Sequence, residues 1–389
     1  MKNLRAPRMA DIAPFHVMEV QERAFKLEAE GRRIVHMEIG QPDYGAPPQV
    51  VEAGIEAMRS RRLGYTSPLG LTELREAISG YYESRMGVRI PPARIAITTG
   101  ASGAFLLVLG SLVGPDDELL MSDPCYPCSR HITRVFEAKP VSIAVDGSTR
   151  YQPTAQHIID AWEPATRGVL LATPANPTGT TIGQPELRSL AQAVRARDGF
   201  LLVDEIYGGL VYDREPSTAL ELGEDVIVVN SFSKYFNMTG WRLGWLVAPE
   251  DLLPEIEKLA QNLYVSPPAP AQFAALAAFL PETLALLEER RLEFQRRRDF
   301  LVPALRSLGF SVPVTPEGAF YVYAGCERFA ADSAAFTLEL LHQAGVAVAP
   351  GMDFGNNAAE RHVRLAYTRS MSELEEGIER LARFICAGR

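Results

Sequence analysis

Short runs of apolar residues alternate along the chain with segments that have helical periodicity. The apolar runs are rich in β-branched and aliphatic residues, and they lie at 94–98, 118–122, 168–173, 200–203, 226–229 and 245–248. Between the third and fourth runs, Leu187, Leu190 and Val194 recur on one helix face after Pro185 in the first turn. This alternation predicts an α/β fold with a largely parallel sheet flanked by helices.

The C-terminal part of the sequence predicts a smaller α+β unit. An arginine-rich stretch at 282–308 has the periodicity of one long helix. Short strands are expected at 319–323 and 363–367, and Ser372 followed by Glu375 predicts a capping box at the start of a last helix. The long helix is therefore expected to join the sheet domain to the smaller unit.

The overall composition is that of an ordinary globular protein. With 389 residues, 47% of them hydrophobic and 22% charged, the chain has room for two domains of usual size. The 39 basic and 48 acidic side chains leave a net charge of −9, which disfavours binding to nucleic acid or to anionic membranes. The apolar runs are shorter than a membrane span and no export signal is visible, so the cytoplasm is the expected location.

Four cysteines are too few for a disulfide scaffold in a chain of this length. Cys125 and Cys128 form a C-x-x-C pair, which is compatible with a redox pair or with half of a zinc site. The sequence has neither a second such pair nor paired histidines, and Pro124 and Pro127 favour a structural turn. We therefore expect no metal site.

Chemically distinctive residues follow five of the predicted strands. The segments at these strand ends read TTGASGA, SDPCYP, TPANPTG, VDEIYG and VNSFSK. They contribute a glycine turn, an aromatic ring, an amide, a carboxylate and an amine. Because ligands of parallel α/β sheets bind beyond the carboxyl ends of the strands, we expect these groups to meet in one site.

Lys234 is one of only five lysines, and it follows an apolar strand among aromatic residues. Burial there would disfavour its ammonium form and free the amine to attack a carbonyl carbon, whereas a surface lysine lying over aromatic rings is the structural alternative. Ser231, Ser233 and Arg242 supply two hydroxyls and a guanidinium, the donors that hold a phosphate. Their alternatives are turn residues and an ordinary salt-bridge partner.

Two other strand ends offer groups for an anionic and a cationic ligand. Gly100, Ala101 and Ser102 open a helical run, where backbone N–H groups bind anions, although a tight turn would also explain the glycine. Asp204 ends an apolar strand and needs a partner, which a cationic ring nitrogen, a helix N-terminus or a structural ion pair could provide. Tyr207, three residues later, could reach the same ligand.

The remaining candidates are an amide and an aromatic ring. Asn176 lies between Pro174 and Pro177 in a rigid loop, where an Asx turn is the alternative to ligand binding. Tyr126 offers a flat face for stacking, although aromatic rings are more often part of the core. An aldehyde-reactive amine, a phosphate cradle, a carboxylate for a ring nitrogen and donors for a ring oxygen together describe a site for pyridoxal 5′-phosphate (PLP).

Further motifs extend this pattern over nearly the whole chain. They are IGQPD (39–43), GYTSPLGLTELREAI (64–78), NPTG (176–179), SFSK, GWRLGW and VRLAY (363–367). In this order they resemble the fold-type-I PLP enzymes, specifically the class I/II aminotransferase superfamily around prokaryotic aspartate aminotransferase. The resemblance implies a large PLP-binding domain at 45–290, with a mostly parallel seven-stranded sheet flanked by helices. It also implies a smaller α+β domain that combines residues 1–44 with residues 291–389.

The resemblance implies a role for each residue that would surround the cofactor ring. Lys234 would hold the cofactor as a Schiff base and move a proton between the substrate Cα and the cofactor's C4′. Asp204 would keep the pyridine nitrogen protonated, so that the ring accepts electrons. Tyr207 and Asn176 would hydrogen-bond the phenolic oxygen, and Tyr126 would stack on the ring.

The same resemblance implies how phosphate and substrate are bound. The phosphate would be held by Gly100, Ala101, Ser102, Ser231, Ser233 and Arg242. Tyr65 would join them from the second subunit of a homodimer. Arg364 would bind the substrate α-carboxylate in a bidentate fork, Gly40 would help to close the site over it, and Tyr126 and Asn176 would also contact the substrate.

The implied activity is transfer of the amino group of an L-amino acid to a 2-oxo acid, by a ping-pong reaction through pyridoxamine phosphate. A PLP-dependent C–S lyase would use the same residues and is the alternative, and a non-catalytic PLP-binding regulator is a third reading. Ser102 stands where the aspartate branch has a lysine that reads the side-chain carboxylate, and Tyr126 replaces a stacking indole. We therefore expect an apolar, aromatic or broad range of amino donors, with 2-oxoglutarate or pyruvate as acceptor. Residues 1–30 have no assigned role, although they could fold over the site entrance.

Overall fold

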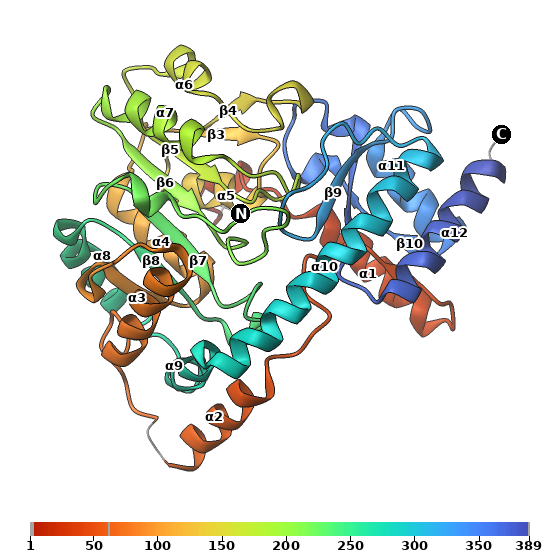
Figure 1. The fold of residues 1–389 in the computed structure, drawn as a ribbon. Coiled ribbons are helices and arrows are strands. Elements are labelled where there is room, and N and C mark those ends of the chain that lie inside the picture. The colour runs from red at the N-terminus through yellow and green to blue at the C-terminus, as the bar shows by residue number, and fades with distance from the viewer. Residues whose placement is uncertain (1–3, 61–62, 388–389) are drawn as a thin grey trace.

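A seven-stranded sheet lies at the centre of the larger part of the computed structural model, which describes residues 4–60 and 63–387 (Figure 1). In spatial order, its strands are β2 (Ile95–Thr98), β8 (Gly244–Val247), β7 (Ile227–Ser231), β6 (Phe200–Asp204), β5 (Thr166–Ala172), β3 (Glu118–Asp123) and β4 (Lys139–Ala144). In this described sheet, β8 alone runs antiparallel to its neighbours. The mostly parallel seven-stranded sheet expected from the resemblance is confirmed.

One strand of this sheet, β4, has no counterpart among the apolar runs identified in the sequence. β4 lies at the edge of the sheet, and most of its side chains are half-buried or exposed, with Ile143 as the buried one. An edge strand needs no continuous apolar run, so the segment KPVSIA has only a weak hydrophobic signal. The other six strands lie within two residues of their predicted positions.

Helices cover both faces of the large sheet. The core on one face involves residues of α4 (Gly100–Leu112), α5 (Pro127–Val135) and α8 (Leu253–Leu263). The core on the other face involves residues of α2 (Pro48–Arg59), α3 (Thr72–Met86), α6 (Ala155–Ala161), α7 (Gln184–Arg195) and α9 (Ala269–Leu276). Neighbouring strand residues belong to opposite cores, since Leu119 packs in the first and Leu120 in the second. Burial on both faces explains why these strands read as continuous apolar runs.

The smaller part of the molecule combines segments from both ends of the chain. Its antiparallel sheet has the order β11 (Ala349–Pro350), β12 (His362–Ala366) and β9 (Tyr321–Gly325). A two-stranded parallel sheet pairs β1 (Val35–His36) with β10 (Val346–Ala347), and so joins the N-terminal to the C-terminal segment. The helices of this part are α1 (His16–Ala29), α11 (Ser333–Glu339) and α12 (Met371–Ala387). The domain boundaries at 44 and 290 stay predictions.

A single helix, α10 (Pro281–Leu308), runs from the larger part of the molecule to the smaller (Figure 1). The long helix expected at 282–308 is thereby confirmed, and the predicted boundary at 290 falls inside it. The buried guanidinium of Arg297 lies 2.9 Å from a carboxylate oxygen of Asp43. This ion pair ties α10 to the segment that leads from β1 into the larger part.

Among the described residues, no single helix has both the length and the hydropathy of a membrane span. Two consecutive helical segments together have the length and hydropathy of a span, but the chain bends by 83° between them. These segments are Ala269–Phe279 and Pro281–Leu308. Apolar residues of this pair, among them Ala274 and Leu301, are fully buried in the protein core.

The capping pair of α12 is Ser370 with Glu373, and the prediction of Ser372 with Glu375 was wrong. The Ser370 N–H and hydroxyl both donate to Glu373 Oε2 (3.1 and 2.6 Å), and the Glu373 N–H donates to Ser370 Oγ (3.4 Å). The two pairs have the same spacing, so local sequence does not distinguish them. The helix begins at Met371, and its cap therefore falls on Ser370.

Candidate active site

The carboxyl ends of β2, β3, β5, β6 and β7 meet at one edge of the large sheet, because these strands point the same way. A cavity of about 260 Å³ lies between this edge and strands β9 and β12 of the smaller part. The predicted site residues that line it are Gly40, Ala101, Ser102, Tyr126, Asn176, Asp204, Tyr207, Ser233, Lys234, Arg242 and Arg364. Groups from all five strand ends are thus brought together in one place.

Lys234 lies in the turn after β7, and its half-buried side chain lines the cavity. Its Nζ donates a hydrogen bond to the carbonyl oxygen of Gly40 (2.7 Å) and lies 6.0 Å from the ring centroid of Tyr207. Burial, with the nearby charges of Arg364 and Arg242, lowers the pKa of this amine to about 8. More of the neutral, nucleophilic amine is therefore present near neutral pH than for an exposed lysine.

Asp204, at the end of β6, is only 5% exposed, and its Oδ1 accepts a hydrogen bond from the backbone N–H of Ile206 (3.0 Å). Burial raises the pKa of this carboxyl group to about 7. A protonated ring nitrogen beside it would offset the cost of burying the ionised form. The adjacent Glu205 is also buried, but it does not line the cavity, and its carboxylate accepts the Thr218 hydroxyl (2.8 Å).

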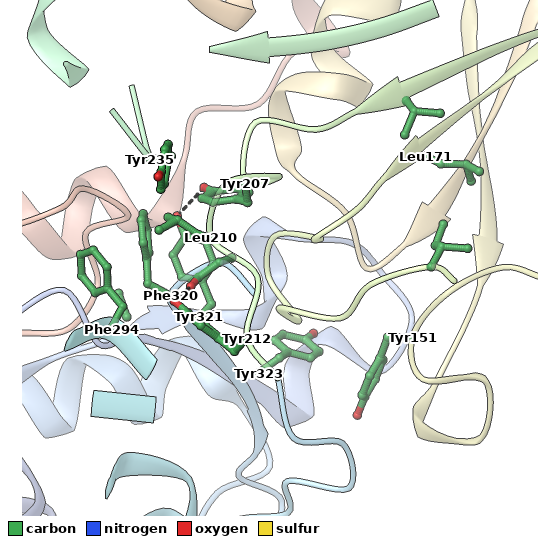
Figure 2. Close-up of a cluster of buried hydrophobic side chains, with 14 of the residues drawn as sticks. Tyr151, Leu171, Tyr207, Leu210, Tyr212, Tyr235, Phe294, Phe320, Tyr321 and Tyr323 are labelled. Atoms are coloured by element: carbon green, nitrogen blue, oxygen red, sulfur yellow. Dashed lines mark hydrogen bonds between the residues drawn. The ribbon is translucent and has the colours of Figure 1, made fainter. Parts of the chain in front are cut away.

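Tyr207 and Tyr321 both line the cavity, and Figure 2 shows them within a cluster of buried aromatic side chains. Their hydroxyl oxygens lie 2.8 Å apart, and their rings meet edge to face at 81°. Burial raises the pKa of Tyr207 well above its ordinary value, so its hydroxyl is neutral and able to donate. Tyr321 was not among the predicted site residues. A Cβ at position 40 would overlap its hydroxyl oxygen, so this packing requires Gly40.

Arg364, in the middle of β12, is held in place by groups from four different segments. Its Nη1 donates to Asn176 Oδ1 (3.0 Å), and its Nη2 donates to the carbonyl oxygen of Glu38 (2.5 Å). The guanidinium also lies 4.4 Å from the ring centroid of Tyr321 and 4.8 Å from that of Phe354. Its buried Nε has no hydrogen-bond partner among the described residues. The guanidinium is therefore fixed in direction while part of its donor capacity is left for a ligand.

A cluster of hydrogen-bond donors lies where α4 begins. Gly100 has a φ of 77°, and a Cβ there would come within 2.7 Å of Arg242 Nη2, so only glycine allows this close approach. The hydroxyl oxygens of Ser231 and Ser233 lie 2.9 Å apart, and Arg242 Nη1 donates to the carbonyl oxygen of Thr239 (3.0 Å). A helix start, two hydroxyls and a guanidinium together provide the donors that a phosphate needs.

Three predicted site residues do not line the cavity in this protomer. Gly100 and Ser231 lie directly behind it, in contact with Arg242 and Ser233 respectively. Tyr65 is 86% exposed and points into solvent in this single chain. Its expected contribution from a second subunit stays a prediction.

The C-x-x-C pair occurs at the turn that leads into α5, whose first residue is Pro127. Cys125 is buried and Cys128 half-buried, and in the part of the chain that the structure describes all four cysteines are free thiols. Arg130 Nη1 lies 3.5 Å from Cys125 Sγ, and burial raises the pKa of this thiol to about 11. A thiol of this kind is unreactive, which agrees with the expected structural turn.

A model of the family "aminotransferase class I and II" matches residues 32–381. The chain belongs to this family. It is 39% identical over 383 residues to a valine–pyruvate aminotransferase of Mycobacterium tuberculosis, with 98% of each chain covered. The crystal structure of an aminotransferase from M. tuberculosis superimposes with a TM-score of 0.95 at 39% identity, covering 99% of this chain and all of the other. The Thermus thermophilus aspartate aminotransferase with maleate gives a TM-score of 0.93 at 31% identity, with the same coverage.

As a member of this family, the protein is a PLP-dependent aminotransferase, and the residues of its cavity fit that cofactor. Because Gly100 has no Cβ, the Arg242 guanidinium lies close to the backbone at the start of α4, and the N–H groups of both can bind one phosphate. The Asp204 carboxyl is buried and the Lys234 amine half-buried, and their pKa values are shifted toward each other. Such shifts are typical of groups that act on a bound ligand.

The N-terminal segment of this aminotransferase, for which the sequence left open a place over the site entrance, contributes residues to the cavity wall that sequence reasoning did not name. Phe15, Val17, Met18 and Gln21 line the cavity, although residues 1–30 had no assigned role. Asp353 anchors the segment, because its two carboxylate oxygens accept the N–H groups of the first two residues of α1 (2.7 Å each). The segment carries no motif, and only its tertiary contacts show where it lies.

Proposed function

We propose that this cavity is where an L-amino acid gives up its amino group and, in a second half-reaction, a 2-oxo acid receives it. The observation that carries the proposal is the Lys234 amine of lowered pKa, which shares one cavity with the Asp204 carboxyl and with the phosphate donors around Arg242. The relatives are named for different amino acids, so family membership leaves the substrate side chain undecided.

Residues from four strand ends would hold the cofactor. Lys234 would bind it covalently through its amine, and Asp204 would pair with its ring nitrogen. Tyr207 and Asn176 would donate hydrogen bonds to its ring oxygen, and Tyr126 would lie against the ring face. The neutral state of the Tyr207 hydroxyl and the buried position of Asp204 support these roles.

The phosphate would lie in the donor cluster at the start of α4. It would be bound by the backbone of Gly100, Ala101 and Ser102, by the Ser231 and Ser233 hydroxyls and by Arg242. The contact between the two serine hydroxyls supports a role for Ser231 behind Ser233. A phosphate at a helix start gains from both the free N–H groups and the helix dipole.

The substrate would be oriented by Arg364 and deprotonated by Lys234. When bound, the cofactor supplies the electron sink for the pair released as a bond to the substrate Cα breaks. Arg364 would bind the α-carboxylate, and its unpartnered Nε and fixed guanidinium support this role. Lys234, freed from its contact with Gly40, would then take the Cα proton because its pKa of about 8 makes it a competent base near neutral pH.

The proposal is tested by mixing the cofactor-loaded enzyme with an amino acid and no 2-oxo acid. We expect the visible absorption band to disappear, with one 2-oxo acid formed per active site and no ammonia released. Stoichiometric pyruvate and ammonia without an acceptor would contradict amino transfer and would instead support the C–S lyase. An unchanged spectrum with every amino acid in a broad panel would contradict both.

We also propose that the enzyme is a homodimer in which the partner's Tyr65 completes each cavity. Tyr65 is exposed in the single chain, and so are several large apolar side chains in and beside α2, among them Val51, Met58 and Leu63. Exposed apolar residues gathered on one surface are typical of an interface. A dimer formed there would bury these residues and bring each tyrosine toward the other subunit.

This arrangement is tested with hybrid dimers at limiting cofactor. Tyr65→Ala should weaken cofactor binding about tenfold or more, through loss of a charge-assisted hydrogen bond to phosphate. Pairing a Tyr65→Ala subunit with a Lys234→Ala subunit should restore one complete site and about half of the wild-type activity. A hybrid no more active than half of the Tyr65→Ala enzyme would show that Tyr65 acts within its own subunit or not at all. An active monomer in light scattering would contradict the dimer itself.

We further propose a cytoplasmic location, where free amino acids and 2-oxo acids are available as substrates. The net charge of −9 supports it, since an acidic surface is repelled by anionic membranes. Cell fractionation that recovers the enzyme activity with the membranes would contradict this location.

A further inference from the structure

Segments outside the large sheet line the cavity mainly with apolar side chains, and Gln21 is the polar residue that α1 adds to them. Phe15, Val17 and Met18 contribute from the N-terminal segment, and Ile39 and Phe354 from the segments that carry Glu38 and Asp353. Arg364 lies 4.8 Å from the ring centroid of Phe354, so this wall begins beside the group proposed to bind the α-carboxylate. A substrate held there would direct its side chain against apolar surface.

The charges around this wall disfavour a second carboxylate. Among the described residues that line the cavity, the cationic side chains are Lys234, Arg242 and Arg364, and each already has a role in binding cofactor or α-carboxylate. The carboxylic acids in the lining are Asp204, Glu38 and Asp353, and the last two belong to segments outside the large sheet. A substrate side-chain carboxylate would therefore lose its hydration without gaining a counter-ion.

Three of the four oxygens of these two carboxylates have hydrogen-bond partners, and Glu38 Oε2 has none among the described residues. Both carboxylate oxygens of Asp353 accept backbone N–H groups at the start of α1. Glu38 is fully buried, and its Oε1 lies 2.7 Å from His36 Nδ1. These contacts fix the two segments on which the apolar wall is built.

A residue of the larger part of the molecule also holds this wall in place. Arg130, on α5, donates from its two Nη atoms to the carbonyl oxygens of Phe354 and Asp353 (2.7 Å each). Asp353 in turn caps α1, which carries Met18. The apolar surface is therefore built from held segments, and it is preorganised for a side chain of matching chemistry.

We propose that this site selects amino acids and 2-oxo acids that have a single carboxylate and an apolar side chain, and that Met18 is a specificity-determining residue of its wall. The inference rests on the proposed function and names its substrate class. Apolar side chains gain free energy by leaving water for this wall, whereas an unpaired carboxylate loses it. The acceptor is subject to the same selection, because both half-reactions use the same cavity.

Equilibrium binding of two unreactive acids to the cofactor-loaded enzyme tests this selection without relying on turnover. 4-Methylpentanoate has one carboxylate and an apolar tail, whereas succinate has two carboxylates, and both lack the amino group. By calorimetry, 4-methylpentanoate should bind at least about tenfold more tightly, because it leaves no buried charge unpaired. Equal affinity, or tighter binding of succinate, would overturn the proposal.

A charge placed on the wall should shift this preference. Met18→Arg should strengthen succinate binding about tenfold by supplying a counter-ion, and it should weaken 4-methylpentanoate binding. Phe25→Arg is the matched control, because Phe25 lies on the same helix, is similarly exposed (52% against 57%) and does not line the cavity. If the two variants behaved alike, Met18 would have no part in specificity.

The outcome for substrate class can be separated from the outcome for the reaction itself. If amino acids remove the visible absorption band but succinate binds more tightly than 4-methylpentanoate, amino transfer is supported and the selection for apolar side chains is contradicted. If no amino acid changes the spectrum, amino transfer itself is contradicted, and the substrate class that rests on it is contradicted as well. Thermal unfolding of both arginine variants identifies a loss of binding that comes from loss of structure.

Discussion

Replacing Lys234 with alanine is expected to remove the visible absorption band of the cofactor-loaded protein and to lower turnover by at least about 10⁴-fold. The effect should be this large because one amine is proposed both to bind the cofactor and to move the Cα proton. The pKa of this amine is lowered to about 8, and no second lysine lines the described cavity to replace it. Absorbance spectra and single-turnover kinetics measure the two losses separately.

Lys258→Ala is the matched control, because Lys258 is an exposed lysine that pairs with Glu255 at 2.6 Å on the surface of α8. It should leave spectrum and turnover unchanged, since exposed ion pairs contribute little. Borohydride reduction followed by peptide mass mapping should place the cofactor label on Lys234 in the wild type. A label on another lysine, or an unchanged spectrum in Lys234→Ala, would refute the assignment.

The second large effect is expected for Arg364→Ala, which should lower kcat/KM for amino acids roughly 10- to 150-fold. This factor corresponds to a loss of about 1.5–3 kcal/mol of transition-state stabilisation. The guanidinium is fixed by Asn176 Oδ1 and by the carbonyl oxygen of Glu38, so it binds a carboxylate without first having to be ordered. The loss should appear with every donor, because all amino acids share the α-carboxylate. The cofactor spectrum without substrate should remain that of the wild type.

A second variant at position 364 separates geometry from charge, and a variant of a nearby exposed arginine serves as the control. Arg364→Lys keeps the charge but loses the planar fork, so it should recover only part of the activity. Arg361→Ala, three residues earlier and with 60% of its side chain exposed, should have no effect. Nearly unchanged kinetics in Arg364→Ala with several donors would exclude its role in carboxylate binding.

Local sequence pattern was sufficient for those parts of the fold whose burial is continuous. Six strands of the large sheet read as apolar runs because both of their faces are covered by helices. The edge strand β4 was missed because its exposed side needs no apolar residues. The cap of α12 was placed two residues late because Ser370 and Ser372 have identical local patterns.

The sequence predicted those site residues that directly follow strands of the large sheet. Groups that follow parallel strands, such as Asp204 and Lys234, must lie at the same sheet edge, so the strand ends alone predicted that they would meet. Tyr321, Met18 and Asp353 could not be found in this way. They come from segments outside the large sheet, and their positions depend on how those segments pack against it.

By itself, the sequence determined the α/β architecture, the mostly parallel sheet and the set of groups at its carboxyl edge. Only the tertiary structure decided the environment in which those groups act. The pKa of Lys234 falls and that of Asp204 rises because distant segments exclude water from both. The proposed preference for apolar substrates likewise depends on which N-terminal side chains line the cavity. Burial of this kind is a property of packing between segments hundreds of residues apart, which no local pattern encodes.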